Sequence, residues 1–486
     1  MKIYLNLKFA SVLILILLLL SASACKGGGG APETEKNTGG EILSVQEDPE
    51  EKTTEVPDNL PERDFGGYNF RIYMRDSGVA NADLYAESEI GEPLNDAVYK
   101  RNKTIDERFN INIDFAYYPT SEWNAVSAQK SILAGDDSFD IAAVHGAAPF
   151  VLSQKNVLLD FFENMPYINF EAPWWSDDII KNLSAFGKLY CITGDISYAS
   201  LDCTLCLLFN KDLFKELNIE YPYNDVINGT WTLDKFISIA KQGMRDIDGD
   251  GIFSPDADRY GFDILNDWAY PISVLYCGGD RVITIGEGGI PELTVYNERT
   301  VGIFDKFFDM LNTPGAAYIR NGETSMFRDG RSLFLSNVLS AIVEHRDMEQ
   351  DIGILPNPKY DESTPKYYSN VDAGRNVFTV PITAKDTERT SIIVEALCVE
   401  GYRKVIPALY DVSLKTKHAR DEESSVMIDY IKDGRVYDYG YFNTSVAGDF
   451  GYCGRNLLAV NNANFTSFYE KNADKVQKNI DKLNNE

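Results

Sequence analysis

Strand-like and helix-like hydrophobic periods alternate over residues 68–144, and this alternation constrains the fold more than any other feature. Residues 68–74 and 111–117 carry apolar side chains at every second position, which is typical of strands with one buried face. Apolar residues recur at helical spacing over 94–109, and a second helix is expected over 123–133. Asp140–Val144 is a short apolar run typical of a buried parallel strand. This order of strands and helices predicts an α/β fold with an open sheet.

The length of 486 residues predicts more than one lobe, because a single hydrophobic core rarely grows beyond about 250–300 residues. Hydrophobic residues make up 44% of the chain, which is enough apolar material for two cores. The 74 Asp and Glu residues exceed the 46 Lys and Arg residues, so the formal net charge is −28. A chain with this balance lacks the basic face that nucleic-acid binding needs, and we expect no nucleic-acid partner.

The first 25 residues have the pattern of an export signal. Lys2 and Lys8 precede an apolar run of 12 residues, Phe9–Leu20, which is shorter than the ~20 residues of a membrane-spanning helix. Small residues follow, and then Cys25. This arrangement resembles the lipobox of bacterial lipoproteins, in which the Cys becomes lipidated and is the first residue after cleavage. The resemblance implies a signal peptide over 1–24, lipidation of Cys25 and a lipid-anchored protein on the outer face of the cell membrane; the alternative is an ordinary secretory signal with a chance Cys.

The residues that follow Cys25 are rich in Gly, Glu, Pro and Thr and almost free of aromatic side chains. Such a composition cannot bury enough apolar surface to fold. We predict a flexible, acidic and Gly-rich tether over residues 25–63 that holds the folded part off the membrane.

Six cysteines remain beyond Cys25, scattered over a long chain rather than arranged as a disulfide scaffold. Cys203 and Cys206 have CxxC spacing but open an apolar run, and no second pair completes a zinc site. We therefore predict buried thiols at these two positions.

Beyond residue 200, five short motifs follow one another in a recognisable order. They are Leu207–Leu217, Thr230–Phe236, Tyr276–Asp280, Met326–Leu335 and Gly353–Pro358. In this order and spacing, over about residues 68–480, the chain resembles the extracellular solute-binding proteins of ABC importers, family 1, which includes the maltodextrin-binding proteins.

The resemblance implies a two-lobed periplasmic-binding-protein-like fold of type II, with discontinuous lobes that a hinge joins and that close on a ligand. The first crossing between lobes is expected at Gly194–Tyr198. By analogy, lobe I would consist of residues 64–195 and 330–375, and lobe II of residues 196–329 and 376–486.

The expected ligand site combines aromatic faces for sugar rings with acids and amides for hydroxyl groups. His145 follows the third strand, where ligands bind in open sheets. The candidate ligand-binding residues are His145, Trp175, Tyr198, Asp202, Trp268 and Tyr270. For each aromatic candidate the alternative is core packing, because the chain has 28 Tyr, 26 Phe and 5 Trp.

A segment that begins at Asp246 matches the first seven positions of a calcium-binding loop. Acids stand at positions 1, 3 and 5, Gly251 at position 6, and a backbone carbonyl is offered at position 7. Position 12 is Ala257 rather than an acid, and Asp258 follows one residue later. The alternative is a solvated acidic turn without a metal. The candidate ligands of a structural Ca²⁺ are Asp246, Asp248, Asp250, Ile252 and Asp258.

The functional hypothesis is a non-enzymatic importer component without a cofactor for its function, which captures a carbohydrate or similar small solute and delivers it to an ABC permease. The chain has three His and no HExxH, GxSxG or Walker motif, so we assign no catalytic residue. Two alternatives stay open: a cell-surface glycoside hydrolase, since chance pairs of carboxylates are inevitable among 74 acids, and a carbohydrate-binding adhesin or sensor without transport.

Overall fold

The structure, a computed structural model, describes residues 56–76, 81–322, 326–345, 347–374, 376–410 and 422–484. The predicted signal peptide, Cys25 and most of the predicted tether lie outside these ranges. The end of the predicted tether is part of the folded unit that begins at Pro57. Asp58 accepts a 2.7 Å hydrogen bond from Arg108, and Leu60 is buried. The predicted tether boundary at residue 63 is therefore too late by several residues.

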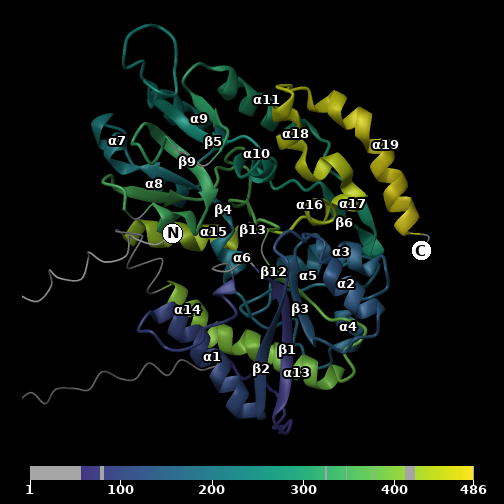
Figure 1. Cartoon of the computed structure of the whole chain (residues 1–486). Coiled ribbons are helices and arrows are strands. Elements are labelled where there is room, and N and C mark those ends of the chain that lie inside the picture. Colours follow the sequence, from purple (N-terminus) through teal and green to yellow (C-terminus); the bar gives the residue numbers. More distant parts are fainter. Residues whose placement is uncertain are drawn as a thin grey trace, which may run out of the picture. The chain divides into compact units, whose positions relative to one another are not determined.

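The first sheet has the strand order β12-β3-β1-β2 (Figure 1). Its strands are β1 (Tyr68–Arg75), β2 (Ile111–Tyr118), β3 (Ile141–His145) and β12 (Asn376–Thr379). β1 pairs in parallel with β2 and β3, and Ile72 stands opposite both Phe115 and Ile141. Helices α1 (Pro93–Phe109) and α13 (Thr387–Glu400) pack against each other beside this sheet, and α2 (Val126–Leu133) connects β2 to β3. The strand and helix pattern predicted for residues 68–144 is confirmed.

The second sheet has the strand order β10-β4-β9-β5-β8. Its strands are β4 (Leu205–Asn210), β5 (Tyr260–Leu265), β8 (Ala317–Arg320), β9 (Ser332–Val338) and β10 (Ile352–Leu355). All six residues of β4 are buried, because β9 and β10 flank it and helices cover the sheet. Those that contact its strands include α7 (Lys211–Glu216), α9 (Leu233–Gln242), α11 (Glu298–Asn312) and α15 (Glu422–Asp433).

The strand pairing differs from the predicted division into lobes. Residues 330–375 were expected beside the first sheet, but they contain β9 and β10, which pair with β4 and β5 of the second sheet. Residues 376–400 were expected with the second sheet, but β12 pairs with β3 of the first sheet. A short buried strand is apolar on both faces, so its composition does not reveal which sheet it joins.

The C-terminal helices continue the second sheet's side of the fold (yellow in Figure 1). Helix α18 (Cys453–Ala459) packs on α10 (Tyr270–Ser273), and α19 (Phe465–Leu483) packs on α11. The remaining short elements are α3 (Ala148–Ser153), α4 (Phe161–Asn164), α5 (Asp177–Leu183), α6 (Ala199–Asp202), α8 (Tyr223–Ile227), η2 (Val274–Gly278), β6 (Ile283–Ile285), η3 (Glu287–Gly289), β7 (Pro291–Leu293), α12 (Ala341–Glu344), β11 (Ser369–Asn370), η4 (Gly401–Val405), α14 (Ile406–Ala408), β13 (Arg435–Val436), α16 (Tyr439–Phe442), α17 (Thr444–Ala447) and η6 (Gly448–Tyr452).

The six cysteines beyond Cys25 are buried free thiols, as predicted for Cys203 and Cys206. Burial raises the pKa of the Cys191 thiol to about 12, so this group stays protonated and inert. Among the described residues, no helix is both long and apolar enough to span a bilayer.

Candidate functional site

A short segment, Asp372–Gly374, connects the edges of the two sheets. The amide of Asp372 donates to the carbonyl of Cys203 at 2.9 Å, next to the start of β4. The carbonyl of Ala373 accepts a 2.8 Å hydrogen bond from the amide of Gly146, directly after β3. This segment therefore lies at the carboxyl end of β3, the position at which open α/β sheets bind ligands, and also beside the start of β4.

Asp372 organises the aromatic side chains around it. Its Oδ2 accepts a 2.6 Å hydrogen bond from Nε1 of Trp268 and a 3.2 Å hydrogen bond from the hydroxyl of Tyr441. Its Oδ1 accepts from the amide of Gly374 at 2.7 Å. Burial, and then the negative charge of Asp372, raise the pKa of Tyr441 well above its ordinary value, so the hydroxyl remains a donor. We call Trp268, Asp372 and Tyr441 the Trp268 cluster.

On the side of the first sheet, Arg75 and Trp123 extend the site. The Arg75 guanidinium carbon lies 4.6 Å from the centroid of the Trp123 ring, and Arg75 Nη2 donates to the carbonyl of Gly374 at 3.1 Å. Trp123 also packs edge-to-face on His145, with ring centroids 5.0 Å apart. Because 53% of Trp123 is exposed, its indole remains an open face on which a sugar ring can stack.

His145 lies in the site as a neutral side chain. Burial lowers the pKa of His145 to about 4; nearby Asp372 opposes this effect and Arg75 adds to it. Nδ1 accepts a 3.1 Å hydrogen bond from the amide of Ala147, which leaves the proton on Nε2. His145 can therefore donate a hydrogen bond to a solute oxygen at neutral pH.

The second sheet's side of the site continues through Tyr452 and Arg455. Tyr452 packs edge-to-face on Tyr441 with ring centroids 5.5 Å apart. The Arg455 guanidinium carbon lies 4.1 Å from the centroid of the Tyr452 ring. Arg455 in turn lines a cavity of about 410 Å³ beside the ends of β5 and β8. Aromatic faces, a carboxylate, a neutral imidazole and two guanidinium groups thus gather in one region, a set that suits a polar, ring-containing solute.

The structure brings together only part of the predicted site. His145 and Trp268 lie in it. Trp175 is buried, and its Nε1 donates a 2.8 Å hydrogen bond to Glu395 in the core of the first sheet. Tyr270 is only 1% exposed and packs on Phe262, so it is a core residue.

The two residues expected at the first crossing also lie outside the Trp268 cluster. Tyr198 is buried in an apolar cluster with Leu201 and Cys206. Asp202 ends α6, and its backbone carbonyl accepts a 2.9 Å hydrogen bond from the amide of Ser340.

Sequence reasoning missed Arg75, Trp123, Asp372, Tyr441, Tyr452 and Arg455. Trp123 was assigned to the predicted helix over 123–133, but α2 begins at Val126 and Trp123 lies in the preceding turn. Only Arg75 carried a usable signal, since it directly follows the strand predicted over residues 68–74, at the ligand-binding edge.

The predicted calcium loop is folded as a closed, acid-lined turn. Ligand oxygens of Asp246, Asp248 and Asp250 lie within 4.8 Å of one another. Asp246 accepts hydrogen bonds from the amides of Gly249 and Gly251 at 2.7 and 2.8 Å. The amide of Asp250 lowers the pKa of Asp248, but burial and the charges of Asp250 and Asp258 raise it overall. A cation would relieve this repulsion.

The other two candidate ligands have structural partners. Asp258 is fully buried, and its oxygens accept from the amides of Ile247 and Ser254 at 2.7 Å each, which closes the loop. Ile252 donates its amide to Asp250 at 2.7 Å, and its side chain is exposed. The donor set fits Ca²⁺ in ligand type, since all three clustered groups are carboxylates.

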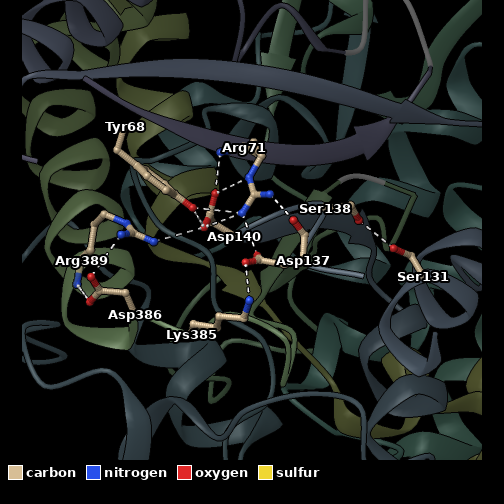
Figure 2. Close-up of polar contacts among 9 residues, drawn as sticks. All are labelled: Tyr68, Arg71, Ser131, Asp137, Ser138, Asp140, Lys385, Asp386 and Arg389. Carbon is tan, nitrogen blue, oxygen red and sulfur yellow. Dashed lines mark hydrogen bonds and ion pairs between the residues drawn. The ribbon is translucent and has the colours of Figure 1, made fainter. Parts of the chain in front are cut away.

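Figure 2 shows another cluster of charged side chains, at the opposite end of β1. Asp140 accepts hydrogen bonds from the hydroxyl of Tyr68 at 2.7 Å and from Nε of Arg71 at 3.0 Å, and Arg71 also bonds Asp137. The Arg389 guanidinium lies 3.5 Å from the centroid of the Tyr68 ring. Burial opposes the charge of Arg71, but the bonds to Asp140 and Asp137 raise the pKa of Arg71 overall. These contacts join β1, the residue before β3 and α13, so the cluster holds the first sheet together.

Comparison with known proteins identifies the fold. No protein-family model and no curated protein matches the chain. The crystal structure of UgpB from Mycobacterium tuberculosis in complex with glycerophosphocholine matches with a TM-score of 0.56 at 14% identity, covering 86% of this chain and 100% of that chain. The cyclic α-maltosyl-1,6-maltose binding protein from Arthrobacter globiformis matches with a TM-score of 0.54 at 13% identity, covering 85% of this chain and 99% of that chain.

A third structure, an ABC substrate-binding protein from Listeria monocytogenes in complex with cycloalternan, matches with a TM-score of 0.52 at 12% identity, covering 86% of this chain and 98% of that chain. All three matches span nearly the whole of the known chain and most of this one. The chain therefore has the two-lobed α/β fold of the substrate-binding proteins of ABC transporters.

Proposed function

We propose that this protein is the extracellular substrate-binding component of an ABC importer and that it binds a carbohydrate or similar polar solute at the Trp268 cluster. The observation that carries the proposal is the shared carboxylate of Asp372, which holds the indole of Trp268 at 2.6 Å between the edges of the two sheets. The Arthrobacter protein with the same fold is named for a cyclic sugar, and the Listeria protein was solved with one.

The arrangement of Asp372 favours binding over hydrolysis. A glycoside hydrolase needs one carboxyl group to donate a proton and a second to act on the sugar from the other side. Both oxygens of Asp372 are occupied by donors from the protein, namely Trp268, Tyr441 and Gly374. Asp372 therefore acts as a positioning acceptor, and the solute leaves unchanged.

We propose that two lobes, assigned from the strand pairing, close on the solute. We assign the first sheet with α1 and α13 to one lobe and the second sheet with α9 and α11 to the other. The chain then crosses between lobes near residues 196–199, 371–376 and 400–408. A solute that touches residues of both lobes stabilises the closed state relative to the open one, and only such differential contacts shift the population.

The location and partners follow from the same function. We propose that Cys25 is lipidated after removal of residues 1–24, that the lipid anchors the protein on the outer face of the cell membrane, and that the closed form delivers solute to an ABC permease. Two acyl chains give stable anchoring, whereas one chain is marginal.

We also propose that Asp246, Asp248 and Asp250 hold a structural Ca²⁺. The three carboxylates converge within 4.8 Å, and backbone donors fix the loop around them. The ion would stabilise the loop between α9 and β5 and take no part in solute binding.

The function is tested with the full mature chain and a panel of neutral and acidic mono- and oligosaccharides. We expect at least one sugar to raise the melting temperature, because a ligand that binds only the native state stabilises it. Small-angle scattering should show a smaller radius of gyration with that sugar, and mass spectrometry should recover the sugar intact. A cleaved sugar, or no thermal shift with any member of the panel, contradicts the proposal.

A further inference from the structure

A cavity of about 410 Å³ beside the Trp268 cluster has a largely apolar wall, to which Ile319, Leu458 and Ala459 contribute, and it carries five polar side chains. Asn266 and Asp267 follow β5, Asn321 follows β8, and Arg455 and Asn456 belong to α18; all five line the cavity. Asp267 directly precedes Trp268 in the chain. On the other wall, Arg455 stacks on Tyr452, which packs on Tyr441 of the Trp268 cluster. The Trp268 cluster does not itself line the cavity; one wall directly precedes Trp268 in the chain, and the other contacts Tyr441 through Tyr452.

Arg455 is the cation of this cavity, and its environment differs from that of a structural arginine. Arg320, which ends β8, forms a buried ion pair with Asp263 at 2.9 Å. Arg455 forms no ion pair with a carboxylate among the residues that the structure describes, although the chain carries 74 acids. The stacking on Tyr452 fixes the plane of the guanidinium and leaves its N–H edge available.

The amide side chains of the cavity supply further polar groups. Nδ2 of Asn266 donates to Oδ1 of Asn321, so Nδ2 of Asn321 remains as a donor and Oδ1 of Asn266 as an acceptor. Nδ2 of Asn456 donates to the carbonyl of Asp449 at 3.0 Å, which leaves its Oδ1 as an acceptor. Asp267 lies exposed at the rim. One guanidinium for an anion and several amides for hydroxyl groups match the chemistry of a sugar that carries a carboxylate.

We propose that this cavity binds the carboxylate of a uronic acid unit, so that the solute is an acidic oligosaccharide with one ring at Trp268 and its carboxylate on Arg455. The inference rests on the proposed function, because it names the substrate class of the same site. A planar guanidinium binds a carboxylate through two parallel hydrogen bonds, whereas a hydroxymethyl group offers no such pair.

The test uses matched sugars that differ only in the charged group: di- and trigalacturonate, di- and triglucuronate, and the same oligosaccharides with each carboxyl group reduced to hydroxymethyl. Isothermal titration calorimetry with the mature wild-type protein should show about 10- to 100-fold tighter binding of an acidic oligosaccharide than of its reduced counterpart. Arg455→Gln should remove this preference while the reduced sugar binds as before.

Two further variants make the result specific. Arg455→Lys keeps the charge without the planar fork and should restore only part of the preference. Arg328→Gln removes an exposed arginine that pairs with Asp347 and lines no part of the cavity, so it should leave the preference unchanged. Unliganded melting temperatures identify any variant that is merely unstable. Equal affinity for acidic and reduced sugars, or a preference that survives Arg455→Gln, overturns the inference and leaves the proposed function intact. If the protein binds neither the acidic oligosaccharides nor their reduced counterparts, the result contradicts the proposed function itself.

Discussion

The indole nitrogen of Trp268 donates a 2.6 Å hydrogen bond to Asp372, which lies 104 residues later in the chain. Trp268 follows β5 of the second sheet, and Asp372 precedes β12 of the first. Tyr441 shares the same carboxylate oxygen. The aromatic face at the candidate site is thus oriented by the protein itself before a solute binds, which lowers the entropic cost of binding.

Replacement of Asp372 by Ala should destabilise the protein by about 1–3 kcal/mol, because the donors of Trp268 and Tyr441 lose their acceptor. It should also weaken binding of whichever sugar gives the largest thermal shift. Asp372→Asn keeps an acceptor oxygen, so this variant should lose less stability and less sugar affinity than Asp372→Ala. Urea unfolding and calorimetry measure the two effects, and equal behaviour of the Ala and Asn variants would contradict the role given to the shared acceptor.

Glu395 should make stability depend on pH. It is fully buried, and Trp174 and Trp175 donate to its two oxygens at 2.8 Å each. Burial raises the pKa of Glu395 from 4.5 to about 7, while both indole donors oppose this effect. The folded state therefore binds the proton of Glu395 more tightly than the unfolded state does. The contribution of this proton to the free energy of unfolding is complete below pH ~4.5 and is lost as the pH rises through ~7.

The measurement compares the wild type with Glu395→Gln by urea unfolding from pH 5 to pH 8. The wild type should lose stability relative to the variant as the pH rises, by an amount on the order of 3 kcal/mol. The Gln side chain does not titrate, and the comparison cancels other groups that do. A difference that stays constant across this range would contradict the buried, proton-binding state of Glu395.

Calcium should raise the melting temperature of the protein relative to the same sample in EDTA. A ligand present at 100 times its dissociation constant stabilises the native state by about 2.7 kcal/mol. Asp248→Ala and Asp250→Asn should abolish the shift, because each removes one of three converging carboxylates. Asp256→Asn, an exposed acid outside that cluster, should keep it. The same melting temperature with and without millimolar Ca²⁺ would exclude the site.

Gly401→Ala should destabilise the segment in which the chain leaves α13. Gly401 begins the π-helical turn η4, and a Cβ at this position would overlap the backbone carbonyl oxygen of Asp195. Backbone atoms cannot move aside as a flexible side chain does, so we expect a loss of about 1–3 kcal/mol. Gly135→Ala is the comparison, since its Cβ would meet no atom and its positive φ costs about 1 kcal/mol. Equal losses in the two variants would show that the close approach at Gly401 has no energetic role.

Cys25→Ser should release the protein from the membrane. Wild-type protein expressed in a bacterium should incorporate labelled palmitate and enter the detergent phase of a Triton X-114 partition. The Ser variant should do neither, because it lacks the thiol that is acylated. Ser23→Ala keeps a small residue before the cleavage point and should remain lipidated. Lipid incorporation by the Cys25→Ser variant would contradict the anchor.

The local elements of the fold were readable from the sequence because their periods are local. The alternation over residues 68–74 and 111–117 predicted β1 and β2. A period of two or of 3.6 is imposed by the burial of one face and needs no knowledge of the partner element. These periods did not reveal that β9 and β10 belong to the second sheet and β12 to the first.

The site was only partly readable. His145 was predicted because it follows a strand at the edge where ligands bind, and Trp268 because it is an aromatic residue ahead of the motif Cys277–Gly279. Trp175 and Tyr270 were indistinguishable from them in the sequence, since an aromatic residue near a strand or turn can point into either core or cleft. Asp372 and Tyr441 carry no motif, and they become site residues only through their contacts with Trp268.

The sequence by itself determined the kinds of element, their order and the acid-rich loop, all of which depend on residues close together in the chain. Only the tertiary structure decided which strands share a sheet and which side chains meet at Asp372. Those outcomes depend on packing and hydrogen bonds between distant segments, such as Asp372 with Tyr441, 69 residues away, and with Trp268, 104 residues away. Such contacts leave no periodic trace in the chain.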